Sequence, residues 1–390
     1  MKVATLSVGF IPLVDAAPLI AAEEMGFAAE EGIALELRRA PSWSSLRDML
    51  SFGQVDAAHM LAPVPIAAAL GLGGAGAALS AVSMLSINGN VIGVSRALET
   101  KLRDAGHGFG FDDAKAAGEA LIAAGGDRIR IGVPFPFSMH AELVFYWLSS
   151  LGYSVPDRVE IRTVPPPLMA DAMAAGEIDA FCVGEPWGSK AVESGVGALL
   201  LPGSAIWACA PEKILAVRSD WAETELSLTG RLIRAVWRAG RWLADPASRV
   251  LAAEMLARPA YLDLAPDIVD RALSGRLVIS ALGEERSVPG FVEFHNGAAG
   301  FPWRSQADWI GRQMALRTGR DPDAAAALAR DIYRSDIYRA ALRNTGADLP
   351  SASSKVEGAL TNDSAAASSG GTLILRRDAF FDGRIFEPGT

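Results

Sequence analysis

Short apolar runs alternate with longer Ala-rich or amphipathic stretches along the first part of the chain. Apolar or alternating runs predict strands, and stretches with helical spacing or a Pro at their start predict helices. The predicted strands are residues 3–10, 33–37, 55–60, 79–85 and 91–95, and the predicted helices are 15–27, 44–52 and a segment that Pro63 and Pro65 open and Gly71 closes. This alternation is typical of a parallel sheet that helices cover on both faces.

A second set of alternating elements follows a Gly- and Ala-rich stretch, residues 97–128, which predicts two helices and a loop. Beyond this set, residues 220–345 are expected to be almost wholly helical, residues 350–372 to form a flexible loop rich in Ser, Ala and Gly, and residues 376–386 to dock back on the body. The second set itself predicts strands at 129–133, 159–163, 180–183, 198–201 and 213–217, and helices at 138–151, 167–175 and 187–193.

The sequence pattern G-x-[VI]-D-A occurs once in each set, as Gly53 to Ala57 and as Gly176 to Ala180. Both copies stand just before a predicted buried strand, so chance in a Gly- and Ala-rich chain is a weaker explanation than a repeated unit. We therefore predict an α/β clamshell of two similar lobes with a cleft between them. The expected boundaries are residues 1–96 and 213–390 for the first lobe and 97–212 for the second. Asp56 and Asp179, within the two copies, are expected to be structural.

The stretch from Gly176 to Gly188 brings a buried strand, a glycine and a new helix to one point. Pro186 suits the first turn of the following helix. Ligands of open α/β sheets bind beyond the carboxyl ends of the strands, and helix N-termini there favour anions. Taken alone, the stretch favours an ordinary strand-turn-helix corner.

Composition and charge narrow the class of protein. With 390 residues, half of them hydrophobic, the chain is long enough for two domains with sizeable cores. A net charge of −9 without a basic run argues against nucleic acid as a direct ligand, although a small anion needs only a local site. The two cysteines, Cys182 and Cys209, form no C-x-x-C motif and are expected to be buried free thiols.

The N-terminal residues bear on where the protein works. Met1 and Lys2 run directly into the first predicted strand, without the apolar region and cleavage site of a signal peptide. No apolar run reaches the length of a membrane span. If Met1 is the natural start, we expect a cytoplasmic protein.

Six short motifs occur in order and together carry a resemblance to a known family. They are A-P-S-W-S-S-L-R-D (40–48), S-I-N-G-N-V-I (86–92), M-H-A-E-L-V-F-Y-W-L (139–148), F-C-V-G-E-P-W (181–187), P-E-K (211–213) and F-P-W-R-S (301–305). Together with the double G-x-[VI]-D-A pattern, they resemble the nitrate- and bicarbonate-binding proteins of ABC uptake systems, of the NrtA and CmpA type, and their soluble nitrate/nitrite-sensing relatives of the NasS type. The resemblance implies a type II periplasmic-binding-protein fold.

The resemblance also implies a set of ligand-binding residues. Matched motif by motif, it assigns the anion contacts to Trp43, Asn90, His140, the backbone amide of Gly184, and Lys213. At position 90 the family pattern has Gln, so the shorter Asn is a departure. Bicarbonate-binding relatives carry a carboxylate where Lys213 stands, and the lysine therefore favours nitrate or nitrite.

The chemistry of these residues fits a small planar anion. Lys213 supplies positive charge, and the indole of Trp43 together with the His140, Asn90 and Gly184 N–H groups supplies donors. Each has an ordinary structural alternative: a hydrophobic staple for Trp43, capping or core packing for His140, a turn for Asn90 and a solvated strand end for Lys213. Glu185 is expected to orient its neighbours or cap a helix.

Three functions remain open from the sequence. The favoured one, implied by the resemblance, is a cytoplasmic nitrate/nitrite sensor that binds the anion between its lobes and thereby releases a NasT-like RNA-binding antitermination regulator. The second is the substrate-binding component of a nitrate ABC transporter. The third is a pyrimidine-forming enzyme on the same fold, with His140 as its candidate residue. We see no nucleophile–base pair, phosphate loop or metal cluster, and expect no catalytic residue, metal or cofactor.

Overall fold

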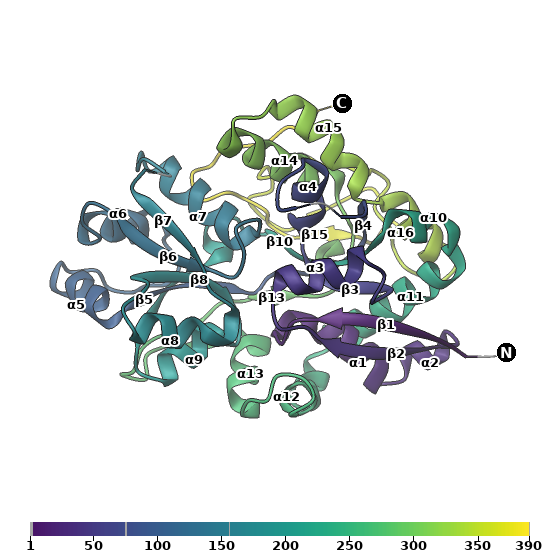
Figure 1. Cartoon of the computed structure of the whole chain (residues 1–390), viewed down its shortest axis with the longest axis horizontal. Helices are drawn as coiled ribbons and strands as arrows, with labels where there is room; N and C mark the ends of the chain where they lie inside the picture. Colours follow the sequence, from purple (N-terminus) through teal and green to yellow (C-terminus); the bar gives the residue numbers. More distant parts are fainter. Residues whose placement is uncertain (1–2, 75, 156, 390) are drawn as a thin grey trace.

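Two β-sheets organise the chain, one in each lobe (Figure 1). The computed structural model describes residues 3–74, 76–155 and 157–389, so the expectations for Met1 and Lys2 lie outside the described residues. The expected α/β fold of two lobes is confirmed. Within the described residues, no helix combines the length and the apolar character needed to cross a membrane.

The first lobe is built on a six-stranded sheet with the order β13-β4-β10-β3-β1-β2. Strands β1, β2 and β3 run parallel, whereas β10 runs antiparallel to both of its neighbours. The strands are β1 (Ala4–Phe10), β2 (Ile33–Arg39), β3 (Ala57–Leu61), β4 (Leu79–Asn88), β10 (Pro211–Arg218) and β13 (Val292–Glu293). The first helices around them are η1 (Val14–Ala16), α1 (Ala17–Glu24), α2 (Phe27–Glu30), α3 (Trp43–Ser51) and α4 (Val64–Ala69).

The second lobe is built on a five-stranded sheet with the order β7-β6-β8-β5-β9. Its strands are β5 (Asn90–Ser95), β6 (Ile129–Val133), β7 (Val159–Thr163), β8 (Ala180–Gly184) and β9 (Gly197–Pro202). Its helices are α5 (Arg96–Asp104), α6 (Ala114–Ala124), α7 (Met139–Ser150), η2 (Pro166–Leu168), α8 (Met169–Ala174), α9 (Trp187–Glu193) and η3 (Gly203–Ala205). The two helices and loop expected over 97–128 and the fully buried strand expected at 180–183 are present.

The sheets are mixed, and the expectation of a parallel sheet was wrong for β10 and β13 in the first sheet and for β5 in the second. The chain leaves the first sheet at the end of β4, passes Gly89 and enters the second sheet as β5, which runs antiparallel to β8 and β9. It returns as β10, antiparallel to β3 and β4. Because a crossing strand enters each sheet from the opposite end, its direction is reversed. The sheets therefore divide at Gly89 rather than near residue 96, where we expected the first crossing.

The two copies of the G-x-[VI]-D-A pattern make the same contact in each lobe. Asp56 Oδ2 accepts the backbone N–H of Ser7 at 2.8 Å, and Asp179 Oδ2 accepts the backbone N–H of Arg130 at 2.9 Å. In both cases the partner lies 49 residues earlier, in β1 of the first lobe and in β6 of the second. Each aspartate thus ties the turn before one strand to the neighbouring strand, which confirms the expected structural role.

The C-terminal region is largely helical and reaches both lobes (Figure 1). The expectation of an almost wholly helical stretch over 220–345 was wrong for residues 276–293, which contain the short strands β11, β12 and β13. Arg317 of α14 forms an ion pair with the buried Glu142 of α7, in the second lobe. The elements of this region are α10 (Ser219–Thr224), α11 (Leu226–Leu243), η4 (Pro246–Ser248), α12 (Arg249–Ala257), α13 (Pro266–Ser274), β11 (Arg276–Val278), β12 (Glu285–Ser287), η5 (Asn296–Ala298), α14 (Arg304–Thr318), α15 (Pro322–Ile332), α16 (Ser335–Leu342), β14 (Ser364–Ala365) and β15 (Ile374–Leu375).

The tail docks back on the body, as the aromatic and charged residues at 376–386 predicted. Phe380 is buried and stacks on Trp207, with ring centroids 4.7 Å apart. Tyr146 of α7 donates a hydrogen bond to Asp382 Oδ1 at 2.8 Å. The tail therefore adds a contact between the C-terminal region and the second lobe.

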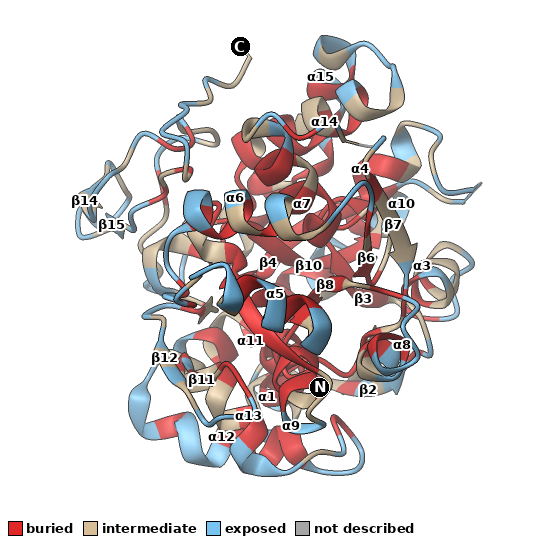
Figure 2. Cartoon of the chain, turned by 90° about the vertical axis from the view of Figure 1, so that its left-hand side faces the viewer, coloured by how far each residue is buried: buried red, intermediate tan, exposed pale blue. Residues whose placement is uncertain are grey.

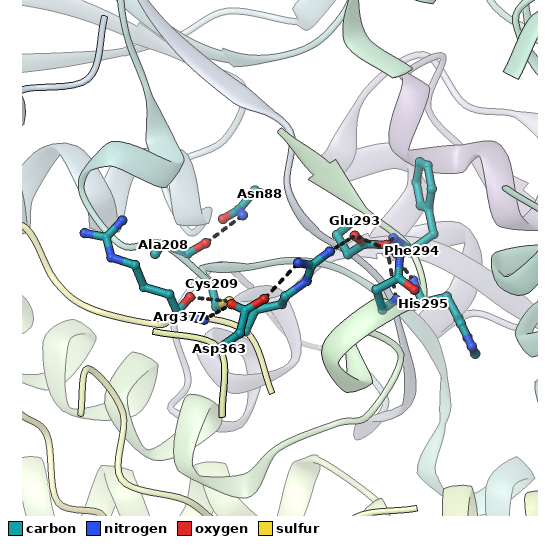
Figure 3. Close-up of polar contacts among 10 residues, drawn as sticks. Asn88, Ala208, Cys209, Glu293, Phe294, His295, Asp363 and Arg377 are labelled. Atoms are coloured by element: carbon teal, nitrogen blue, oxygen red, sulfur yellow. Dashed lines mark hydrogen bonds and ion pairs between the residues drawn. The ribbon is translucent and has the colours of Figure 1, made fainter. Parts of the chain in front are cut away.

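Asn88 ties together the two places where the chain crosses between lobes (Figure 3). Its side-chain amide donates to the carbonyl of Ala208 at 2.8 Å, and its amide oxygen accepts the N–H of Ala210 at 3.0 Å. Its φ of 59° places it in the left-handed region, which asparagine adopts more readily than most residues. The Cys209 thiol, between these two contacts, donates to the carbonyl of Arg377, so the tail also covers this crossing.

The buried core runs through both sheets, while the outward faces of the surrounding helices are exposed (Figure 2). Several polar and charged side chains are buried with it, including Asp15, His59, His140, Glu212 and Lys213. A buried charge is costly unless it is paired, so these residues need partners inside the protein.

Candidate functional site

The buried charged residues meet where the ends of the strands of the two lobes face each other. The first lobe contributes Asp15 from η1, Trp43 from α3, His59 from β3, and Glu212 and Lys213 from β10. The second lobe contributes Asn90 from β5, His140 from α7 and Gly184 from β8. All five predicted ligand residues therefore lie on elements that meet between the two lobes.

Lys213 lies at the centre of the site as a fully buried ammonium. Its Nζ is 2.7 Å from Asp15 Oδ2 and 2.7 Å from Glu212 Oε1, and 5.6 Å from the centroid of the Trp43 ring. Burial alone would lower the pKa of Lys213, but the two carboxylates outweigh burial and raise it. The lysine is therefore charged, and two carboxylates already compensate that charge.

Asp15 is held in place by His59 as well as by Lys213. His59 Nε2 lies 2.8 Å from Asp15 Oδ1, and His59 Nδ1 accepts the N–H of Ile11 at 3.5 Å. Burial would raise the pKa of Asp15, but Lys213 and His59 outweigh it and lower the pKa to about 2. Burial lowers the pKa of His59. The geometry thus fits a neutral imidazole with its proton on Nε2, directed at an ionised aspartate.

Glu212 joins the two lobes across the cleft. Its Oε2 accepts a hydrogen bond from Asn90 Nδ2 at 2.7 Å, and its Oε1 lies 3.3 Å from His140 Nδ1. Burial raises the pKa of Glu212, which Lys213 and Asn90 offset only in part. Asn90 therefore donates one of its two amide protons to Glu212. Its amide oxygen faces Gly203, where a Cβ atom would lie only 1.8 Å away. A direct contact from Asn90 to a ligand remains a prediction.

Two buried nitrogen atoms at the site have neither a hydrogen-bond partner nor an ion-pair contact among the described residues. They are Nε1 of Trp43 and Nε2 of His140. An unsatisfied buried donor costs about 1–3 kcal/mol. At the meeting of the two lobes, each of these two atoms is therefore a candidate contact for a ligand. Burial and Lys213 together hold the pKa of His140 well below its ordinary value. His140 is thus neutral in the absence of a ligand.

Gly184 stands directly beside these atoms. A Cβ atom at this position would lie 3.7 Å from His140 Nε2 and 3.6 Å from Asp15 Oδ2. Gly184 pairs with Asn90, and the next residue donates its N–H to the carbonyl of Gly89 at 3.0 Å. Since hydrogen-bonded and non-hydrogen-bonded pairs alternate in an antiparallel ladder, the N–H of Gly184 points away from β5. The Gly184 N–H therefore makes no hydrogen bond to β5, as its predicted role as a donor to the anion requires.

The helix that follows Gly184 does not offer its N-terminus to a ligand. Both carboxylate oxygens of Glu185 accept the N–H of Ser189 at 3.1 Å, so a protein carboxylate already occupies the first turn. This agrees with the capping role expected for Glu185. Burial raises the pKa of Glu185 to about 7, against the opposing effect of Ser189.

Direct contacts between the lobes close the cleft over the site. The N–H of Val14 donates to the carbonyl of Glu185 at 3.0 Å, and Trp187 Nε1 donates to the carbonyl of Pro12 at 2.8 Å. Trp43, His140 and the other site residues are consequently buried. The conformation is the closed one, in which a bound ion would be surrounded by protein.

Sequence reasoning missed three members of the site: Asp15, His59 and Glu212. Asp15 stands alone in an apolar stretch, and His59 stands within an apolar strand. Glu212 lies in the P-E-K motif that was used only to locate Lys213. A lone ionisable residue in an apolar stretch must find a partner when buried, and that signal could have identified the first two.

Comparisons with known proteins agree with the fold. The model of the NMT1-like family matches residues 1–257. The nitrate/nitrite binding protein NrtA of Synechococcus elongatus is 29% identical over 405 residues, covering 99% of this chain and 84% of that protein. The crystal structure of the periplasmic nitrate-binding protein NrtA from Synechocystis PCC 6803 superposes with a TM-score of 0.84 at 26% identity, covering 99% of this chain and 96% of that one.

A longer relative matches as well. The nitrate import ATP-binding protein NrtC of Synechococcus elongatus is 33% identical over 350 residues, which is 88% of this chain. The chain spans 51% of the length of that protein. The family match covers more than half of the chain, and the structural match covers nearly all of it. The chain therefore belongs to the NMT1-like family and has the two-lobed periplasmic-binding-protein fold.

Proposed function

We propose that this chain binds nitrate or nitrite between its lobes and that closure around the anion signals to a partner protein. The observation that carries the proposal is the convergence of Trp43 Nε1, His140 Nε2 and the Gly184 N–H beside the buried ammonium of Lys213. The similarity to NrtA proteins over 99% of the chain supports the choice of anion.

The strength of binding follows from the donors. Hydrogen bonds that involve a charged group contribute about 1.5–3 kcal/mol each in a site without water. Three or four of them give a binding free energy of about −8 kcal/mol, which corresponds to micromolar affinity. A planar, weakly basic anion such as nitrate suits donors that approach from several sides, and the Trp43 ring provides a flat apolar wall.

Closure gives the protein its means of signalling. A ligand that prefers the closed state shifts the population toward it, and a partner that distinguishes the two states is then bound or released. Our proposal is that the protein is a cytoplasmic sensor whose partner is a NasT-like antitermination regulator, released when nitrate binds. A binding component of a nitrate ABC transporter has the same site and would instead engage a permease.

A thermal-shift series tests the ligand. Nitrate and nitrite should raise the melting temperature with saturation, whereas bicarbonate, sulfate and pyridoxal phosphate should have no such effect. Stabilisation by pyridoxal phosphate alone would favour the pyrimidine-forming enzyme and would refute the proposal, as would the absence of any shift with nitrate and nitrite.

A pull-down experiment tests the partner. The protein is immobilised and offered the NasT-like regulator and the permease encoded by the same genome, with and without nitrate. Capture of the regulator without nitrate, and its release as nitrate is added, supports the sensor. Capture of the permease, or a complex with the regulator that nitrate does not change, would contradict it.

A further inference from the structure

With Asp15 and Glu212 both ionised, the net charge of the site does not favour an anion. Lys213 contributes one positive charge, but Asp15 and Glu212 both contact its ammonium at 2.7 Å. When both carboxylates are ionised and His59 is neutral, the site has an excess of one negative charge. Inside a protein, where charges are screened less than in water, this excess repels a second anion.

The orientation of His140 raises the same difficulty. Its Nδ1 lies 3.3 Å from Glu212 Oε1. A neutral His140 can carry its proton on Nδ1, the nitrogen near the Glu212 carboxylate, although the alignment of this contact is not that of a hydrogen bond. The free Nε2, which faces the position of Gly184, then carries a lone pair and cannot donate to an anion. A neutral histidine in this tautomer repels the ligand.

One added proton removes both difficulties. We propose that the Glu212–His140 pair takes up one proton from solution when the anion binds, so that the site accepts a monovalent oxyanion together with H⁺. The proton resides either on Glu212, which then donates to Nδ1, or on His140 as imidazolium. In both arrangements Nε2 carries a hydrogen directed at the ligand, and the excess negative charge is gone. The two residues titrate as one unit.

The surroundings favour the pair as the place where the proton is held. Asp15 is excluded because Lys213 and His59 keep its pKa at about 2. Lys213 is already charged. Asn90 donates to Glu212 and does not titrate. Burial raises the pKa of Glu212, which brings its protonated form closer to neutral pH.

Glu212 also acts on two further titratable groups nearby, Tyr333 and Cys182. Tyr333 donates its hydroxyl to the carbonyl of Ala62 at 3.3 Å, and Cys182 lies in β8. Burial, reinforced by Glu212, raises the pKa of both groups. Both therefore stay protonated and neutral throughout the accessible range and cannot supply the missing positive charge.

The proposal rests on the proposed function, and calorimetry separates the two. Nitrate is titrated into the protein at pH 8 in two buffers whose ionisation enthalpies differ, since nitrate itself does not titrate in this range. The difference in heat gives the number of protons taken up. We expect uptake approaching one proton per nitrate, and an affinity that falls by up to about tenfold for each pH unit between 6 and 9.

The calorimetric results distinguish a failure of the proton-uptake inference from a failure of the proposed function. Nitrate binding without proton uptake and with constant affinity across this range overturns the inference but leaves the proposed function intact. The absence of nitrate binding at every pH overturns the proposed function itself. Neither result depends on a variant, so the test holds even if substitutions at the site impair folding.

A pair of matched variants locates the proton. In Glu212→Gln the amide N–H can donate to His140 Nδ1 permanently, so this variant should bind nitrate with no proton uptake and more tightly than the wild type at pH 9. Glu185→Gln removes another buried carboxylate, whose pKa is about 7, and should retain the uptake. Uptake that survives Glu212→Gln, or that disappears in Glu185→Gln, would overturn the assignment.

Discussion

The ammonium of Lys213 contacts Asp15 Oδ2 at 2.7 Å inside the closed cleft. The residue that the sequence singled out as the positive charge for an anion is therefore also half of a buried ion pair. Removing one partner of such a pair leaves an uncompensated charge, which costs far more than the pair contributes. Changes at Lys213 thus act on stability and on binding together.

We expect Lys213→Met to lower the free energy of unfolding by about 3–5 kcal/mol, because Asp15 and Glu212 lose their shared cation. Nitrate should no longer stabilise the variant. Chemical denaturation measures the first effect and thermal shift the second. The double variant Lys213→Met/Asp15→Asn should be destabilised by less than the sum of the two single changes. Strict additivity would mean that the contact does not contribute as described.

Asp15 gives the protein a defined acid sensitivity. Its pKa is 3.8 for the free side chain and about 2 when folded. A lowered pKa means that the stabilisation is complete above pH 4 and is lost as the pH falls through 2. The shift corresponds to about 2 kcal/mol. The difference in unfolding free energy between wild type and Asp15→Asn should therefore shrink between pH 4 and 2. A constant difference across this interval would refute the assignment.

Trp43→Phe tests a single donor. The phenyl ring keeps most of the packing but removes Nε1, which has no protein partner among the described residues. Nitrate affinity should fall by about tenfold or more, equivalent to about 1.5 kcal/mol, while stability without nitrate changes little. Calorimetric titration measures the affinity.

Trp207→Phe is the matched control. Trp207 is also buried, and its Nε1 has no hydrogen-bond partner in the part of the chain that the structure describes, but it packs against Phe380 of the tail instead of bordering the cleft. Its affinity for nitrate should equal that of the wild type. An equal loss of affinity in both variants would indicate a general effect of the substitution rather than a contact with the anion.

Gly184→Ala places a methyl group where we expect the anion. The new Cβ would lie 3.7 Å from His140 Nε2 and 3.0 Å from Leu13 Cδ2, the far end of a side chain that can shift. We expect a folded protein whose nitrate affinity is reduced at least tenfold. Gly108→Ala is the control, since its Cβ would meet nothing within 4 Å. Wild-type affinity in Gly184→Ala would remove the glycine from the site.

Asp56→Ala probes the repeated contact of the first lobe. The N–H of Ser7 loses its acceptor, and the unfolding free energy should fall by about 1–3 kcal/mol. Nitrate affinity of the folded protein should be unchanged, because the contact lies away from the cleft residues. Denaturant titration and calorimetry separate the two effects. A selective loss of affinity without a loss of stability would contradict the structural role.

Local patterns predicted most of the architecture. Apolar runs located β8 and the strands of both lobes, and the repeated G-x-[VI]-D-A pattern located equivalent corners whose aspartates make the same contact. The reversed direction of β5 and β10 was not predictable, because it depends on which sheet a strand joins after crossing between lobes. No local pattern encodes that choice.

The site was predicted in part for a similar reason. Motifs placed Lys213 and His140 at the cleft, but they could not reveal that Glu212 contacts both or that Asp15 shares the lysine. The Asp15–Lys213 contact joins distant segments within the first lobe, and the Glu212–His140 contact joins the two lobes. The two carboxylates change Lys213 from a free cation into a compensated one.

The central claim is that the closed cleft binds nitrate, and a calorimetric titration of nitrate into the wild-type protein at pH 7 tests it most directly. We predict one site per chain with micromolar affinity, about −8 kcal/mol, and no measurable heat from sulfate at the same concentrations. The absence of saturable nitrate binding, or equal binding of sulfate, would contradict the account.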